Sequence, residues 1–364
     1  MQTVLSLLTR LLMVFTLAAY LSVLVSPVLF WPAAVLSLCI PLALLLNLLA
    51  LAFWGYRRHR LFWLPLLALV AGWPFVKATF AWGDRPQATA DFTVLTYNVE
   101  VFKLYQRQRG KTSPPENIVN WLVTDNADIK CLQEFYNEAS SDVFNTTRRL
   151  KTASHPHVWV VPAITNRIGG QFGLAIFSRY PLVKKGKIDF DGGGSNGAIY
   201  ADVATGKGTV RVVNVHLESL RMDEQDLQID RNNYKYKSKG LLKIFRRAAP
   251  AHARQLGQLL KLMQDSPHPV IICGDFNETP YGYLYFQLKR HMYSAFEEAA
   301  RGFGFTFNDS KLFFLRIDHQ FFAEGLQVLW QETAYSAGFS DHFPVKAGYV
   351  FSREEAAAAD ATPR

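Results

Sequence analysis

An acid and an amide follow a short apolar run at residues 270–273 of this 364-residue chain. The run has the length and composition of a buried strand, and Gly274 ends it. Asp275 and Asn277 follow two residues apart, so both face the same side if the extended backbone continues. A carboxylate and a carboxamide at the mouth of a strand suit the edge of an active site. A strand ending in an Asx turn would show the same residues, so this stretch alone supports both interpretations.

Six strand-like runs in the second part of the chain end in polar residues of this kind. They are Asn98, Glu134, Asn214 with His216, Asp275 with Asn277, Asp318, and Asp341 with His342. A polar side chain at the end of a buried strand is costly unless something uses it. Its repetition at six strand ends therefore indicates one shared site.

The residue types in this set limit its chemistry. Carboxylates and amides without a thiolate cluster suit a hard cation such as Mg²⁺ or Mn²⁺. Histidine beside them can move a proton or stabilise negative charge. The sequence has no Walker-type loop and no G-x-S-x-G elbow. Metal-assisted attack of water on a phosphate ester is the reaction that uses such a set.

The elements that must position these residues are short strands with helices between some of them. Strands are predicted at residues 93–99, 129–133, 173–178, 199–203, 209–216, 270–273, 317–322 and 344–350, and helices at 116–124 and 251–263. Residues 199–216 read as a hairpin around Gly206 and Gly208. This pattern predicts an α/β fold, a four-layered α/β sandwich in which two packed mixed sheets carry outer helices.

The chain before about residue 82 has a different composition. Three runs nearly free of charge, at residues 11–31, 33–56 and 61–80, each have the length that a bilayer core requires. We therefore expect a membrane anchor of about three transmembrane helices over residues 1–82. A cleaved signal peptide would explain the first run only.

The positive charges predict an orientation for this anchor. Arg10 precedes the first run, and residues 57–60 are rich in arginine, so both are expected in the cytoplasm. With three spans, the protein would be a multi-pass protein of the cell membrane. The chain after residue 82 would then lie outside the cytoplasm. Two spans would reverse that result, because Trp73 and Pro74 interrupt the last run.

Four further segments and residue sets complete the organisation. Residues 83–91 read as a linker, and 351–364 as a disordered tail after a catalytic domain at 92–350. Residues 219–249 turn from acidic to basic, which suits a solvated loop or a flap that touches phosphate. Cys39, Cys131 and Cys273 have neither disulfide nor metal-ligand spacing and are expected to be free thiols.

The ordered polar strand ends resemble the endonuclease/exonuclease/phosphatase superfamily over roughly residues 92–350. The motifs that carry the resemblance are Tyr97-Asn98-Val99, Gln133-Glu134, Asn214-Val215-His216-Leu217, Gly274-Asp275-Phe276-Asn277, Arg316-Ile317-Asp318 and Ser340-Asp341-His342. The resemblance implies hydrolysis of phosphate esters with a divalent metal, Mg²⁺ or Mn²⁺. In such a site Glu134 would be the main metal ligand, with Asn98 and Asp341 beside it.

The resemblance also implies roles for the other strand-end residues. Asp275 would orient or deprotonate the attacking water, and Asn277 would hold that water or a phosphate oxygen. His342 would contact the scissile phosphate, with Asp318 fixing its tautomer and charge. His216 would stabilise charge on the phosphate or help the leaving group.

For two further residues the sequence leaves two roles open. Asn214 would contact phosphate or brace its loop. Glu100 reads as a surface acid that could touch the metal shell.

The expected function is that of a membrane-anchored, metal-dependent phosphodiesterase, nuclease or phosphatase. The expected partners are a bilayer and a phosphate ester of nucleic acid or phospholipid, and no obligate protein partner is indicated. A phospholipid or sphingomyelin-type phosphodiesterase is an alternative, for which residues 313–315 and 321–322 could form an apolar rim or simply core. A non-catalytic module that binds a phosphorylated ligand is a further alternative, although none of the acids is missing.

Overall fold

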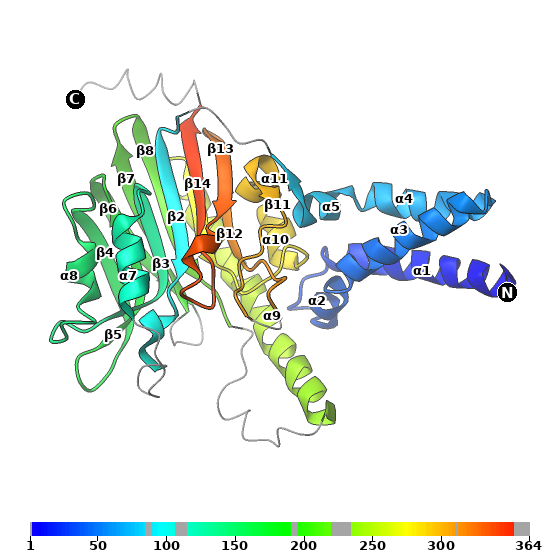
Figure 1. Ribbon diagram of the computed structural model, residues 1–364, viewed down its shortest axis with the longest axis horizontal. Coiled ribbons are helices and arrows are strands. Elements are labelled where there is room, and N and C mark those ends of the chain that lie inside the picture. Colours follow the sequence, from blue (N-terminus) through cyan, green and yellow to red (C-terminus); the bar gives the residue numbers. More distant parts are fainter. Residues whose placement is uncertain are drawn as a thin grey trace. The chain divides into compact units, whose positions relative to one another are not determined.

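The computed structural model describes residues 2–83, 89–105, 115–190, 196–219, 234–309 and 312–352 (Figure 1). The chain forms two compact units. The strand-rich unit consists of residues 81–218, 258–277 and 291–364, and the helical unit of residues 1–80, 219–257 and 278–290. The second and third ranges of the helical unit interrupt the strand-rich unit in the sequence.

Two six-stranded sheets form the strand-rich unit. The first sheet has the order β10 (Tyr293–Ser294), β12 (Asp318–Phe322), β9 (Val270–Asp275), β8 (Gly208–His216), β7 (Gly197–Thr205) and β6 (Leu182–Asp189). The second has the order β13 (Leu326–Thr333), β14 (Val345–Phe351), β2 (Phe92–Asn98), β3 (Ile129–Asn137), β5 (Gln171–Ser178) and β4 (His157–Thr165). Strands β8 and β9 are parallel, as are β2 and β3, and the other neighbours in both sheets are antiparallel. A small third sheet pairs β1 (Ala81–Trp82) with β11 (Arg301–Gly302).

The two large sheets enclose one apolar core. Val94 of β2 and Ile271 of β9 belong to the same buried cluster, so one face of each sheet points inward. Leu95, the next residue of β2, instead belongs to a second cluster with Ile118 of helix α7 (Pro115–Thr124). This alternation follows from the two-residue period of a strand and leaves α7 covering an outer face.

Short helices accompany the strands. They are η2 (Glu100–Lys103), α8 (Thr146–Leu150), α11 (Ala295–Ala299) and η4 (Tyr335–Ala337). The long helix α9 (Tyr234–Gln264) begins in the helical unit, and its last turns reach the first sheet. There the Arg211 guanidinium donates to the Leu262 carbonyl at 3.5 Å.

The predicted fold class, two mixed sheets with helices, is confirmed. The predicted hairpin is β7–β8, which closes with Thr205 opposite Gly208. The predicted helix at 251–263 is the second half of α9. Strands β4, β6 and β13 were not predicted, because lysines, a proline or exposed positions obscure their period.

The helical unit contains six helical elements in its first 80 residues. They are α1 (Gln2–Ser22), α2 (Pro32–Ser37), α3 (Ile40–Tyr56), η1 (Arg60–Phe62), α4 (Trp63–Ala71) and α5 (Trp73–Thr79). Polar side chains join them. Asn47 donates to the Thr16 hydroxyl at 2.7 Å, and the Trp54 indole donates to the Thr9 hydroxyl at 2.9 Å. Helix α10 (Tyr283–Leu288) also belongs to this unit.

The apolar runs do not fold as three uninterrupted spans. Helix α1 ends at Ser22, well before the end of the predicted run 11–31, and it contains Arg10, which was expected to precede it. The run 33–56 is divided between α2 and α3, and α3 begins beside Pro41. The run 61–80 bends by 59° between α4 and α5, where Gly72 and Pro74 stand.

Of the described helices, α1 alone is long and apolar enough to cross a membrane by itself. The bent pair α4–α5 passes the same test only when both helices count as one broken span. The 17 residues of α3 extend about 25 Å, which is less than the ~30 Å hydrocarbon core. The prediction of three spans therefore reduces to one candidate span, or two if the bent pair is counted.

Parts of three predicted segments lie outside the described residues. These are residues 84–88 of the linker, 220–233 of the acidic-to-basic segment and 353–364 of the tail.

Candidate active site

Three predicted residues meet where strands of the two sheets end. Asn98, His216 and Asp275 are the last residues of β2, β8 and β9. The Asn98 amide donates to Asp275 Oδ2 at 2.9 Å, which connects the second sheet to the first. His216 Nε2 lies 3.7 Å from the same carboxylate oxygen. Asp275 is therefore the buried centre of the cluster.

Glu134 reaches this cluster because β3 is irregular at that residue. The pairing of β3 with β5 shifts register between Leu132 and Phe135, and Glu134 has a φ of 47°. A non-glycine residue with positive φ is uncommon and often marks a functional site. Glu134 Oε1 accepts from the Asn98 amide at 3.3 Å and lies 3.8 Å from His216 Nε2.

Asn277 also has a positive φ, of 49°. Its backbone N–H donates to Asp275 Oδ1 at 2.9 Å, as in an Asx turn. Its side-chain amide donates to the Leu217 carbonyl at 3.2 Å. The Asx turn, one of the two interpretations that the sequence left open for this stretch, is therefore present, and it lies beside the carboxylate cluster.

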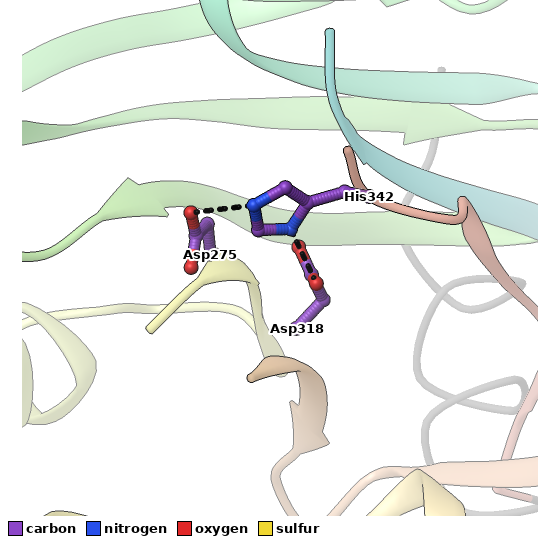
Figure 2. A group of neighbouring side chains, drawn as sticks. All are labelled: Asp275, Asp318 and His342. Atoms are coloured by element: carbon purple, nitrogen blue, oxygen red, sulfur yellow. Dashed lines mark hydrogen bonds and ion pairs between the residues drawn. The ribbon is translucent and has the colours of Figure 1, made fainter. Parts of the chain in front are cut away.

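His342 lies between two buried carboxylates (Figure 2). His342 Nδ1 lies 2.8 Å from Asp318 Oδ2, and Nε2 lies 3.7 Å from Asp275 Oδ2. Asp318 is brought there by strand pairing, since it stands opposite Asp275 where β12 pairs with β9. Strand pairing thus fixes the two carboxylates, and His342, in the segment before β14, lies between them.

The buried ionisable groups hold one another in charged forms. Burial lowers the pKa of His342, but the carboxylates of Asp318, Asp275 and Asp341 outweigh burial and raise it to about 10. Burial raises the pKa of Asp275, but His342, His216 and the Asn98 amide more than offset this and hold it below its usual range. Burial raises the pKa of Asp318 to about 6, although His342 opposes that shift. At neutral pH, His342 is an imidazolium between two carboxylates.

Asp341 is held by Glu100. The Asp341 N–H donates to Glu100 Oε2 at 2.9 Å, and Lys103 Nζ lies 2.5 Å from that oxygen. Burial and the charge of Asp341 raise the pKa of Glu100. Glu100 and Lys103 begin and end a turn in which every residue has positive φ. Glu100 is therefore a partly buried acid in contact with Asp341, and not the surface acid of one interpretation. Its position two residues after Asn98 is the sequence feature that could have indicated a place near the cluster.

Asn214 is not brought to the cluster of carboxylates. It is fully buried, and its amide donates to the Leu132 and Ala175 carbonyls of the second sheet, each at 3.0 Å. Its oxygen accepts from Gln133 at 2.6 Å. These bonds occupy both donors of the amide, so the contacts of Asn214 are those of a brace between sheets.

Glu134 and Asp341 are the more exposed carboxylates of this set and are the ones that could hold a divalent cation. The side chains of Glu134 and Asp341 are each 21% exposed, whereas Asp275 and Asp318 are almost fully buried. Carboxylate oxygens suit Mg²⁺ or Mn²⁺. The Asn98 side chain turns its NH2 group toward Glu134 and Asp275, while its oxygen accepts from the Glu100 N–H at 3.0 Å. Asn98 could therefore offer its oxygen to a cation beside Glu134 only if the amide turns over.

Asp275, Asp318 and His342 form a tighter group, with potential ligand atoms within 4.8 Å of one another. His342 Nδ1 already lies 2.8 Å from Asp318 Oδ2, and the neighbouring carboxylates raise the pKa of the imidazole, which favours the protonated ring over a metal ligand. This buried group therefore fits charge stabilisation better than metal binding.

Two family models match parts of the chain. Residues 95–342 match the endonuclease/exonuclease/phosphatase family, and residues 2–79 match a domain of unknown function. No curated protein matches the chain.

Solved structures share the fold at low sequence identity. An endonuclease/exonuclease/phosphatase family protein from Leptotrichia buccalis has 14% identity and a TM-score of 0.52, covering 70% of this chain and 98% of its own. A protein of the same description from Beutenbergia cavernae has 17% identity and a TM-score of 0.52, covering 72% of each chain. One from Bacteroides thetaiotaomicron has 19% identity and a TM-score of 0.50, covering 72% of this chain and 96% of its own. The chain, matched by the family over residues 95–342, belongs to the endonuclease/exonuclease/phosphatase family.

Proposed function

We propose that this protein is a membrane-anchored, divalent-metal-dependent hydrolase of phosphate esters. The family to which it belongs consists of phosphoester hydrolases. The observation that carries the proposal is the environment of Asp275, whose Oδ2 faces Asn98, His216 and His342 within 2.9–3.7 Å. A buried carboxylate surrounded by an amide and two imidazoles suits the handling of water and phosphate charge.

Each of these groups has a proposed task. Asp275 has a lowered pKa, so it serves better to orient a water by hydrogen bonding than to store its proton. The His342 imidazolium offers Nε2 to a phosphate oxygen on which negative charge develops. Asp318 keeps that imidazole charged and oriented. Glu134 and Asp341 hold the divalent cation, which when bound acts as a Lewis acid toward phosphate and lowers the pKa of bound water.

The anchoring part of the proposal rests on α1. This helix has 21 residues, and many of its apolar side chains, such as Leu7, Leu11 and Val14, are exposed. Exposed leucine and valine along a helix of this length suit a lipid environment. Trp63 and Trp73 are also more than half exposed, as residues at a membrane interface are.

A phospholipid ester is the alternative to nucleic acid as substrate. Phe313 and Phe314 are 60% and 50% exposed, whereas Phe321 and Phe322 are core residues. An exposed pair of phenylalanines on the segment that leads into Asp318 suits contact with acyl chains. Phe313 and Phe314 could therefore form an apolar rim, whereas the buried Phe321 and Phe322 could not.

The test is hydrolysis by the full-length protein in detergent micelles. Plasmid DNA, a sphingomyelin-like phosphodiester and a soluble phosphomonoester are compared with Mg²⁺, with Mn²⁺ and with EDTA. Glu134→Gln should lower kcat/KM by about 10²- to 10⁴-fold, because it removes a metal-holding charge. Glu332→Gln, at an exposed position of β13, is the matched control and should change little.

Two outcomes would contradict the proposal. Hydrolysis that persists in EDTA would show that the reaction does not depend on a divalent metal. Full activity of Glu134→Gln would show that Glu134 is not a required metal ligand. Melting temperatures of both variants show whether a loss of activity is a loss of fold.

A further inference from the structure

Helix α9 is basic along its whole length. It contains no Asp or Glu, and its Lys and Arg residues are Lys235, Lys237, Lys239, Lys243, Arg246, Arg247, Arg254 and Lys261. The reaction proposed above uses none of them. A helix with so one-sided a charge suits a surface that carries many negative charges.

The middle of α9 has two distinct faces. Ile244, Ala248 and His252 are spaced by four residues and are buried. Lys243 and Arg247, together with Arg246, Arg254 and the 45% exposed Leu242, are exposed. We call these four basic residues with Leu242 the basic face. Exposed basic residues beside an exposed leucine are typical of a helix that lies on a membrane surface.

The buried face fastens α9 to the rest of the helical unit. His252 Nδ1 lies 3.0 Å from Glu278 Oε2, in the segment that continues into α10. In that same segment the Tyr281 hydroxyl lies 2.9 Å from Thr79 Oγ1 of α5. Helix α9 and the N-terminal apolar helices are far apart in the sequence. Side-chain contacts through residues 278–290 nevertheless join them within one compact unit.

We propose that the basic face of α9 binds the phosphate headgroups of an anionic bilayer, the bilayer in which α1 is anchored. The inference rests on the membrane anchoring in the proposed function. Each Lys or Arg held near an anionic membrane surface strengthens binding by about fivefold. The phosphates of nucleic acid would attract the same charges, but the apolar helix α1 in the same unit favours lipid.

The test compares the full-length protein in two kinds of nanodisc. One contains zwitterionic lipid only, and in the other about one third of the lipid is anionic phosphatidylglycerol. Backbone hydrogen exchange is followed over residues 242–257. Exchange should be slower by about fivefold or more in the anionic discs. The difference should vanish in high salt, which shortens the Debye length from about 10 Å to about 3 Å.

A triple charge reversal, Lys243→Glu, Arg246→Glu and Arg247→Glu, should abolish the protection by anionic lipid. The matched control reverses three exposed basic residues of the strand-rich unit, Arg148, Lys151 and Lys184, and should keep it. Both triple variants should hydrolyse a soluble phosphate ester at the normal rate. Glu134→Gln should lose hydrolysis and keep the protection, which separates this inference from the proposed chemistry.

Equal exchange in the two lipids would overturn the inference. So would protection that appears in zwitterionic discs when duplex DNA is added and not with anionic lipid, because α9 would then be a nucleic-acid surface. Failure of the protein to enter discs of either composition would overturn the anchoring on which the inference depends.

Discussion

The charge on His342 is maintained by its neighbours and not by solvent. The imidazole is 2% exposed, and its two nitrogens face Asp318 and Asp275. Without those carboxylates, burial would lower its pKa, since a buried cation loses its hydration. In the proposed reaction Asp318 is thus a positioning residue, which would act on phosphate only through His342.

Activity should depend on pH through this pair. The reacting form needs Asp318 ionised, so kcat/KM should rise with pH through about 6. It also needs His342 protonated, so kcat/KM should fall as pH rises toward about 10. In Asp318→Asn the strongest attractive charge is gone, the pKa of His342 falls, and the alkaline limb should move to lower pH. The measurement is the kcat/KM profile on a soluble ester, and an unmoved alkaline limb would mean that another group titrates there.

The thiols of the strand-rich unit should be inert in the native protein. Cys131 and Cys273 are free and fully buried between the sheets, and burial raises the pKa of Cys131 well above its usual range. Because the thiolate is the reactive form, neither should react with a thiol reagent until the unit unfolds. Counting modified thiols by mass, with and without denaturant, checks this. Cys39 of the helical unit, which is partly exposed, is an internal comparison.

At the scale of elements, the end of β9 depends on one glycine. Gly274 has a φ of 149°, and a Cβ there would lie 2.0 Å from the Val215 carbonyl oxygen of β8. The parallel strands can approach this closely only without a side chain. This approach sets Asp275 opposite His216 in the register of β8 and β9.

Gly274→Ala should therefore destabilise the strand-rich unit by about 2 kcal/mol or more, which lowers its Tm by roughly 5 °C. Gly206→Ala is the matched control, since a Cβ at Gly206 meets nothing within 4 Å. Thermal unfolding followed by near-UV circular dichroism compares the two variants. Equal Tm values for both would show that β8 and β9 adjust without cost.

What the sequence predicts about the elements depends on which strands are buried. β2 and β9 are buried along almost their whole length, so their apolar runs and polar ends are visible as a pattern. β6 contains three lysines and β4 contains Pro162, so neither has a clear period. The positive φ of Glu134 could not be foreseen, because no glycine or asparagine stands at that position.

The apolar runs of the helical unit show a second limit of sequence reasoning. Composition gives the total apolar length, whereas the helix ends depend on prolines at helix starts, as at Pro32 and Pro41. A window of about 20 residues averages across such breaks. Polar pairs such as Asn47 with Thr16 depend on which helices pack together, so no single run indicates them.

At the scale of the whole molecule, the helical unit is assembled from separate parts of the chain. Residues 278–290 directly follow the turn that carries Asn277, yet their side chains pack within the helical unit. The ring of Phe286 lies 4.8 Å from that of Phe75 on α5. A chain shortened to begin at residue 81 would lose this contact, because Phe75 would be absent.

A double-mutant cycle on Phe75 and Phe286 in the full-length protein should therefore show coupling. Each change to alanine alone should lower the free energy of unfolding by about 1–3 kcal/mol, and the two together by less than the sum. The expected coupling is about 0.5–1.5 kcal/mol, the range measured for aromatic pairs. Phe313→Ala, at an exposed ring of the strand-rich unit, is the control and should add to Phe286→Ala without coupling. If Phe75→Ala and Phe286→Ala were also additive, the segment after Asn277 would be stable without its contact to the N-terminal helices, and the packing of Phe286 on Phe75 would not hold the two parts of the helical unit together.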